Sequence, residues 1–379
     1  MCETSMLNHG VMEDKGSYNR NSRVQASGIM RSLPLLEKAV RDLDVDDEEQ
    51  PLVIADYGSS QGKNSMAPMR VAIKALRERV GPDRPIVVFH IDQPANDFNT
   101  LFQVLDTDPD RYVLDEPNVF PCAIGRSFYE SMFPREYIHL GWSSYAAVWL
   151  SRIPTLIQDH FIVLRSSGAE RAAFEQQAAH DWEAFLSLRA RELQPGGRLM
   201  IVLPGQNDDG GAGFEFLFDI ANDVLKEMVL VGEIRSDERK RMVLGTYPRR
   251  KCELLAPFQA DSQFRGLRVE HYDFASLPDP AWSDYERDGD LEALATKHAR
   301  LFRSIFVPSL TLSLTAAHDA EQRHIFAEHF EQRLKQNLSN RPRPLHSFVQ
   351  TLVVAKESSC RTWTAEPREM IKQVGTNPD

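Results

Sequence analysis

The sequence predicts an α/β protein with a doubly wound, mostly parallel sheet and a helical cap subdomain. Over the first 205 residues, short apolar runs alternate with stretches of helical periodicity, which is typical of a parallel sheet covered by helices. After Pro204 the apolar residues recur at helical spacing, which indicates a second, mainly helical part.

The first unit of the sheet is the clearest. We expect a strand at Leu52–Asp56, a small-residue turn over 57–64 and a helix over 65–79. A second buried strand is expected at 85–91, and it ends before Asp92. Together these segments form a strand, turn, helix and strand unit, which requires parallel strands.

The remaining elements follow in chain order. The core is expected to hold strands at 120–124, 137–140, 161–164 and 198–203, with a long helix at 174–193 before the last of them. The second part is expected to hold helices near 214–230, 289–305 and 319–336, and strands returning to the sheet near 266–274 and 345–356. These boundaries divide the chain into a core of residues 1–205, which the two returning strands join, and a mainly helical substrate cap of residues 206–344. The acidic stretch 42–50 is interpreted as a solvated linker.

Composition excludes several classes of partner. The 379 residues carry a formal net charge of −11, so neither a nucleic-acid backbone nor an anionic membrane is expected as a partner. The four cysteines are scattered, without a CxxC pair, which argues against disulfides and a zinc site and favours a reducing compartment. No apolar run approaches membrane-spanning length and the start of the chain is polar, so a cytoplasmic protein is expected.

A ligand site is expected where the first two strands end. Asp56 is followed by Gly58 and Gly62, and Asp92 closes the second strand. Glycines there let a ligand approach the backbone, and an acid after the second strand can accept hydrogen bonds from two ribose hydroxyls. Such an acid suits nicotinamide dinucleotides and adenosylmethionine equally, although the Gly-x-Gly-x-x-Gly fingerprint is missing. An ordinary strand-to-helix turn and a helix-capping acid remain alternatives at this point.

Six segments, which follow one another in a defined order along the chain, indicate which of these ligands is bound. They are Gly16-Ser-Tyr-Asn-Arg-Asn-Ser-Arg-Val-Gln25, Asp56-Tyr-Gly-Ser-Ser-Gln-Gly-Lys-Asn64, Asp92-Gln-Pro-Ala-Asn-Asp-Phe-Asn99, Gly125-Arg-Ser-Phe-Tyr129, Ser143-Ser-Tyr-Ala-Ala-Val-Trp-Leu-Ser-Arg-Ile-Pro154 and Pro195-Gly-Gly-Arg-Leu199. The series resembles the motifs of the SABATH family of carboxyl methyltransferases, which act on salicylate, benzoate, jasmonate or indole acetate and include the N-methylating caffeine synthases. The segment ending at Pro154 is the most specific of the six.

The resemblance implies a Rossmann-like methyltransferase sheet, S-adenosyl-L-methionine as cofactor and S-adenosyl-L-homocysteine as product. With the turn residues already named included, the predicted cofactor contacts are Tyr18, Asp56, Gly58, Ser59, Asn64, Asp92, Gln93, Ser127 and Phe128. The resemblance assigns Gln25 and Trp149 to the substrate carboxylate as catalytic residues, and Val148 to the wall of the substrate pocket. A homodimer is also implied, because family members are often dimers.

These residue types suit methyl transfer to an acid. A carboxylic acid with a pKa of about 4 is ionised at neutral pH, so no general base is required. The enzyme must align the reacting atoms and exclude water. The N–H groups of Trp149 and Gln25 are neutral donors that can fix one carboxylate oxygen without the strong ground-state binding of a salt bridge. The predicted product is the methyl ester of a small aromatic carboxylic acid.

Departures from the family pattern set the limits of the prediction. Ser59, Gln61 and Lys63 replace its usual residues in the cofactor turn, Gln93 replaces a leucine, and no Asp-x-Phe-Asn segment is found around 240–247. No metal is therefore expected. An N-methyltransferase of a heterocycle, a non-catalytic ligand binder and an oxidoreductase remain alternatives. Either Arg249 or Arg250 is a candidate partner for a second carboxylate of the substrate, and His139 is interpreted as a core histidine.

Overall fold

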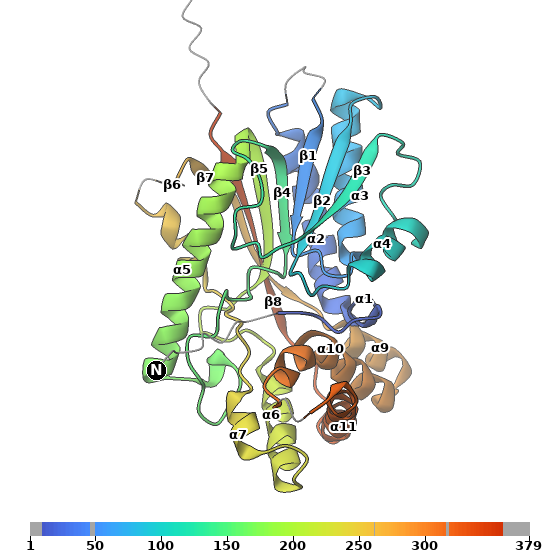
Figure 1. The fold of residues 1–379 in the computed structure, drawn as a ribbon, viewed down its shortest axis with the longest axis vertical. Helices are drawn as coiled ribbons and strands as arrows, with labels where there is room; N and C mark the ends of the chain where they lie inside the picture. The colour runs from blue at the N-terminus through green and yellow to red at the C-terminus, as the bar shows by residue number, and fades with distance from the viewer. Residues whose placement is uncertain (1–9, 46–49, 261, 316–317, 359–379) are drawn as a thin grey trace, which may run out of the picture.

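A computed structural model of the chain describes residues 10–45, 50–260, 262–315 and 318–358. Its centre is an eight-stranded sheet in the order β3-β2-β1-β4-β5-β8-β7-β6 (Figure 1). The strands are β1 (Leu52–Tyr57), β2 (Ile86–Asp92), β3 (Val119–Gly125), β4 (Ile138–Ser144), β5 (Leu193–Pro204), β6 (Gln263–Phe264), β7 (Leu267–Leu277) and β8 (Ser347–Lys356).

The first five strands are parallel and the last three are antiparallel. In the register, Ile54 of β1 pairs with Val88 of β2 on one side and with Leu140 of β4 on the other. β8 returns between β5 and β7 and is antiparallel to both. The order of the strands reverses between β1 and β4, and ligands of doubly wound sheets bind beyond the carboxyl ends of the strands at such a reversal.

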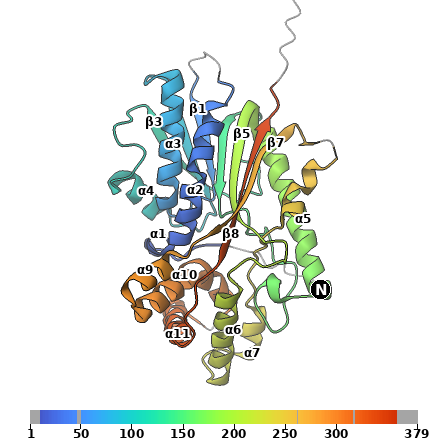
Figure 2. The ribbon, with the colours of Figure 1, turned by 180° about the vertical axis from the view of Figure 1, so that it is seen from behind.

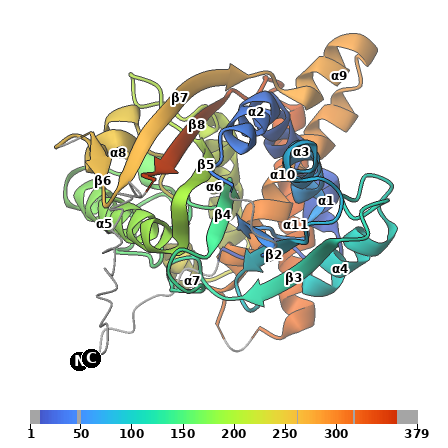
Figure 3. The same ribbon diagram turned by 90° about the horizontal axis from the view of Figure 1, so that it is seen from above.

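Helices cover both faces of the sheet, which explains why β1 is buried along its whole length. α2 (Arg23–Arg41) and α3 (Lys63–Val80) pack on one face, and α5 (Gly168–Glu192) packs on the other (Figure 3). The short helices α1 (Ser17–Asn21) and α4 (Phe98–Thr107) lie beside the end of the sheet where the β1 and β2 turns are found (Figure 1).

A second group of helices lies below the sheet (Figures 1 and 2). It consists of α6 (Glu215–Leu230), α7 (Ser236–Arg241), α9 (Pro280–Asp288), α10 (Leu291–Thr311) and α11 (Ala320–Ser339), while α8 (Lys251–Leu255) lies beside the sheet. Buried side chains of α6, α10 and α11 form one hydrophobic cluster, and Val148 and Trp149, from the loop after β4, belong to it. The loop after β4 therefore joins the sheet to these helices.

Most predicted elements are present, and two differences are instructive. The apolar run 161–164 is not a strand: Val163–Arg165 forms one turn of 3-10 helix, because a short apolar run is compatible with any buried backbone. α2 escaped prediction, since Gly28 and Pro34 disfavour a helix and packing against α3 and the sheet stabilises it instead. The predicted linker 42–50 lies partly outside the described residues.

His139 is a core histidine, as predicted. Its Nδ1 accepts a hydrogen bond of 3.1 Å from the backbone N–H of Val53, and its side chain is buried. Within the described ranges, no helix combines the length and the apolar character needed to cross a membrane.

Candidate active site

The turn after β1 forms one wall of a pocket at the end of the sheet. Gly58 has a φ of 95°, and a Cβ there would collide with the Cβ of Ala146 in the loop after β4. Only glycine combines this backbone conformation with this close approach. The next residues, Ser59 and Ser60, have buried hydroxyl groups that bond to no described residue. Of these residues, Gly58 and Ser60 line the pocket, so the turn offers it one hydroxyl group without a partner beside the glycine backbone.

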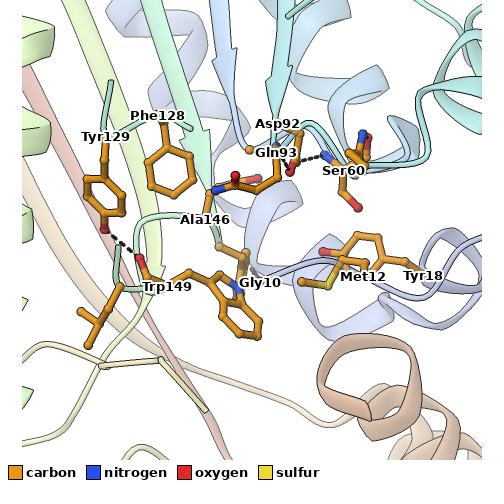
Figure 4. A pocket seen from close by; sticks show the side chains of 15 residues that line it. Gly10, Met12, Tyr18, Ser60, Asp92, Gln93, Phe128, Tyr129, Ala146 and Trp149 are labelled. Carbon is orange, nitrogen blue, oxygen red and sulfur yellow. Dashed lines mark hydrogen bonds between the residues drawn. The ribbon is translucent and has the colours of Figure 1, made fainter. Parts of the chain in front are cut away.

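Asp92 closes β2 and faces the same pocket (Figure 4). Its carboxylate accepts hydrogen bonds of 2.7 Å from the backbone N–H groups of Ser60 and Gln93. Burial raises the pKa of Asp92 to about 6, and these two hydrogen bonds oppose that rise. The side chain of Asn96 donates to the carbonyl oxygen of Ser60 at 2.8 Å, which ties the loops after β1 and β2 together.

The structure brings five of the predicted cofactor residues together around this pocket. They are Tyr18, Gly58, Asp92, Gln93 and Phe128. The others lie behind or beside it. Ser59 is buried within the turn, Asn64 donates to the hydroxyl of Ser22 at 3.0 Å, and Ser127 accepts a hydrogen bond from the backbone N–H of Tyr129 at 3.2 Å.

Asp56 is the clearest departure from a direct cofactor contact, because its carboxylate is already occupied. It accepts a hydrogen bond from the Ser65 hydroxyl at 2.5 Å and lies 3.0 Å from Nδ1 of His90. Nε2 of His90 lies 2.8 Å from the Tyr112 hydroxyl. All four side chains are buried, so this chain of polar groups supports the turn from behind instead of lining the pocket.

A second pocket adjoins the first and contains all three predicted substrate residues, Gln25, Val148 and Trp149. Its volume is about 860 Å³, counting the part open to solvent. The described residues that line it include no acid, base or histidine. The Oε1 atom of Gln25 is buried without a hydrogen-bond partner among the described residues. The pocket thus combines an apolar wall with a few neutral polar groups.

Hydrogen bonds hold the loop that carries Trp149 from several directions. The Tyr129 hydroxyl donates to the carbonyl oxygen of Trp149 at 2.7 Å (Figure 4). The backbone N–H of Leu150 donates to the carbonyl oxygen of Gly245 at 2.7 Å, and that of Tyr247 donates to the carbonyl oxygen of Val148 at 2.9 Å. These hydrogen bonds fix the backbone of the loop that carries the indole.

Arg249 contributes to the same loop and not to the pocket, which corrects a prediction from the sequence. Its buried guanidinium donates to the carbonyl oxygens of Ala147 at 2.7 Å and Ala178 at 2.8 Å. Arg250 donates to the carboxylate of Glu253 at 2.9 Å. Neither arginine lines the second pocket, so the prediction that one of them binds a second carboxylate of the substrate is wrong. The guanidinium of Arg249 instead satisfies the buried carbonyl oxygens of Ala147 and Ala178.

Two features near the site were missed. Tyr145 lines both pockets and has a φ of 55°, which is rare outside glycine. A Cβ at Gly28 of α2 would collide with its hydroxyl group, so Gly28 makes room for this ring. Tyr145 lies inside the quoted Ser-Ser-Tyr segment, but its backbone conformation has no signal in the sequence.

The other missed feature is the segment before α1, which crosses both pockets. Met12 lines both of them, and Gly10 lies against the indole ring of Trp149. Glu13 fixes the segment: its backbone carbonyl accepts from the Gln61 side chain at 2.6 Å, and its carboxylate accepts from Arg303 of α10 at 2.8 Å. We call residues 10–16 the strap.

Comparison with known proteins adds four findings. A family model described as SAM dependent carboxyl methyltransferase matches residues 3–353. The chain is 30% identical over 256 residues to the methyltransferase LUC1 of Fusarium sp, with 66% of each chain covered. It is 28% identical over 312 residues to the salicylate carboxymethyltransferase of Clarkia breweri, covering 78% of this chain and 84% of the relative. A solved structure of loganic acid methyltransferase with SAH has the same fold, with a TM-score of 0.73 and 24% identity over 94% of this chain and 99% of that one.

Proposed function

We propose that this chain, which belongs to the family of SAM dependent carboxyl methyltransferases, forms the methyl ester of a small aromatic carboxylic acid. The observation that carries the proposal is the second pocket. It places the neutral donors of Gln25 and Trp149 in an uncharged, apolar site directly beside the pocket that contains Asp92. The relative from Clarkia breweri is named for salicylate, an acid of this class.

The residues of the first pocket fit S-adenosyl-L-methionine. The unpartnered hydroxyl of Ser60 and the carboxylate of Asp92 suit the polar amino-acid and ribose groups of this cofactor. The ring of Phe128 is available for its base, and Gly58 permits close approach to the backbone. When bound, the cofactor supplies a methyl group carried on a positively charged sulfur.

The second pocket would hold the acid in its ionised form. Trp149 and Gln25 both line this pocket, and the Oε1 atom of Gln25 is buried without a hydrogen-bond partner among the described residues. Both can therefore donate to one carboxylate oxygen and leave the other free. Because the acid is already ionised at neutral pH, the chain needs no general base. Orientation and exclusion of water are then its main contributions, and orientation alone can lower a barrier by roughly 7–11 kcal/mol.

We assign the helical part of residues 206–344, without the sheet strands β6 and β7, to a cap that shapes the acid pocket. α6 and α10 supply Phe218, Ile305 and Phe306 to its wall, and the preceding core residues supply the donors. In this division the core performs the transfer and the cap selects the acid. A cytoplasmic location and a homodimeric assembly stay predictions of the sequence.

A transfer assay tests the proposal. Purified protein is incubated with S-adenosyl-L-methionine labelled in the methyl group and with benzoate, salicylate, indole acetate, fumarate or a xanthine. We expect extractable label with an aromatic acid, and its loss in Trp149→Ala but not in Trp282→Ala, a tryptophan of α9 outside both pockets. Label on the xanthine alone would favour N-methylation, and binding of cofactor without transfer to any compound would favour a non-catalytic binder.

A further inference from the structure

Four aromatic rings form a row along the acid pocket, beginning at the indole of Trp149. The ring centroids of Trp149 and Phe306 are 6.2 Å apart, those of Phe306 and Phe218 are 5.1 Å apart, and those of Phe218 and Phe214 are 6.4 Å apart. All four residues line the pocket. These spacings fall within the range at which aromatic rings attract one another. We call this series the aromatic row.

The row differs from ordinary core packing at two positions. Phe306 and Phe214 are only half-buried, whereas Phe302 and Phe330, in the same group of helices, have no exposed surface. The open surface of the two half-buried rings faces a pocket, so it is available to a ligand.

Polar groups gather at one end of the pocket. Tyr18 and Tyr145 share with Trp149 the part that meets the cofactor pocket, and Gln25 is a further polar residue of the acid pocket. Phe214, the last ring of the row, lines the acid pocket and not the cofactor pocket, and the same holds for Ala212 and Phe218. No described lining residue there could pair with a second charge. A ligand that fills the pocket therefore has one charged end and a long apolar body.

We propose that the acid is extended: an apolar aromatic monocarboxylate of at least two rings. Its carboxylate lies at Trp149 and its body runs along Phe306 and Phe218 to Phe214, which makes Phe214 a specificity-determining residue. This inference rests on the proposed function. A single six-membered ring stacks on about two rings of such a row, so it leaves Phe214 in contact with water.

Three acids of increasing length test the inference. Benzoate is compared with biphenyl-4-carboxylate, which adds a second ring, and with biphenyl-4,4′-dicarboxylate, which adds a charge at the far end. Each fully buried methylene group raises affinity about fourfold, so we expect kcat/KM for biphenyl-4-carboxylate to exceed that for benzoate by more than tenfold. The dicarboxylate is expected to fall below the monocarboxylate of equal length.

Variants of residues in the aromatic row test which ring is responsible for the preference for longer acids. Phe214→Ala should lower kcat/KM for biphenyl-4-carboxylate about tenfold and change that for benzoate less than twofold, whereas Phe306→Ala should lower both. Phe326→Leu is the matched control: Phe326 belongs to the same hydrophobic cluster but does not line the pocket, so its loss should leave the ratio unchanged.

The outcomes separate this inference from the proposed function. Benzoate turnover equal to that of the longer acid, or a Phe214→Ala enzyme with an unaltered ratio, would overturn the extended acid and leave the methyltransferase standing. If no acid is methylated, the proposed function fails. Calorimetric binding of the same acids to protein loaded with S-adenosyl-L-homocysteine still tests the row in that case, because the length preference is a property of binding.

Discussion

The two pockets share a wall but are built in different ways. The cofactor pocket is made largely of the turns that follow β1, β2, β3 and β4, and its loops are fixed by hydrogen bonds to backbone groups such as those of Ser60 and Gln93. The acid pocket is made mainly of apolar side chains from α2, the loop after β4, α6 and α10.

This difference predicts which of the two pockets tolerates amino-acid substitutions. A site built from backbone turns tolerates few changes, because each residue must fit a fixed conformation. A site built from apolar side chains can change its shape while its helices remain in place. Changes on the cofactor side should therefore abolish binding, whereas changes on the acid side should alter rate and selectivity.

The largest effect is expected from Gly58→Ala. The new methyl group would collide with Ala146, and the positive φ of Gly58 adds about 1–2 kcal/mol of backbone strain. Together we expect at least a 100-fold loss of affinity for S-adenosyl-L-homocysteine by calorimetry, given about 1.4 kcal/mol for each factor of ten. Gly81→Ala is the control, since Gly81 also has a positive φ but its Cβ would meet no atom within 4 Å. Equal behaviour of the two variants would refute the role of the turn.

Trp149→Phe should affect the acid side far more than the cofactor side. It keeps an aromatic ring but removes the N–H donor, and a hydrogen bond to a charged group contributes about 1.5–3 kcal/mol. We expect kcat/KM for the acid to fall about 10- to 150-fold by the same conversion, while affinity for S-adenosyl-L-homocysteine changes less than twofold. The control is Trp282→Phe. A parallel fall in cofactor affinity would show that the two sides cannot be separated.

Asp92 gives the cofactor side a pH dependence. Its pKa of about 6 means that the carboxylate is ionised above that pH and protonated below it. Protonation removes an acceptor for the ribose hydroxyls, so affinity should weaken as the pH falls. Between pH 7.5 and pH 5 we expect about a tenfold loss of affinity for S-adenosyl-L-homocysteine. Asp92→Asn should bind weakly with a flat profile; a retained slope would assign the effect to another group.

The smallest effect is expected at the strap, which lines both the cofactor pocket and the acid pocket. Arg303 joins Glu13 of the strap to Glu331 of α11, and these side chains are partly exposed. Exposed pairs contribute at most about 1 kcal/mol, so Arg303→Met should raise KM for both substrates about threefold. Arg300→Met is the control, because Arg300 pairs with Glu331 but not with the strap. A change in KM for only one substrate would contradict a strap that covers both pockets.

The same contrast explains what the sequence could predict. Gly58 and Asp92 were found because they follow apolar runs directly, so a local pattern marks them. Trp149 and Gln25 were found through segments that resemble a family. No local sequence pattern identifies Phe214, Phe218 and Phe306. These rings come together only when α6 and α10 pack, and helical spacing does not predict which ring faces a cavity. Arg249 was misjudged for the same reason, since its carbonyl partners are distant in the sequence.

The shared wall has a thermodynamic consequence. Met12, Tyr18, Tyr145 and Trp149 line both pockets, so a shift of any of these side chains that improves the fit of one ligand alters the surface offered to the other. Binding linkage is reciprocal: the factor by which the acid changes the dissociation constant of the cofactor equals the factor by which the cofactor changes that of the acid. A cap that is altered to admit a new acid therefore also retunes, through these four side chains, how tightly the methyl donor and its spent product are held.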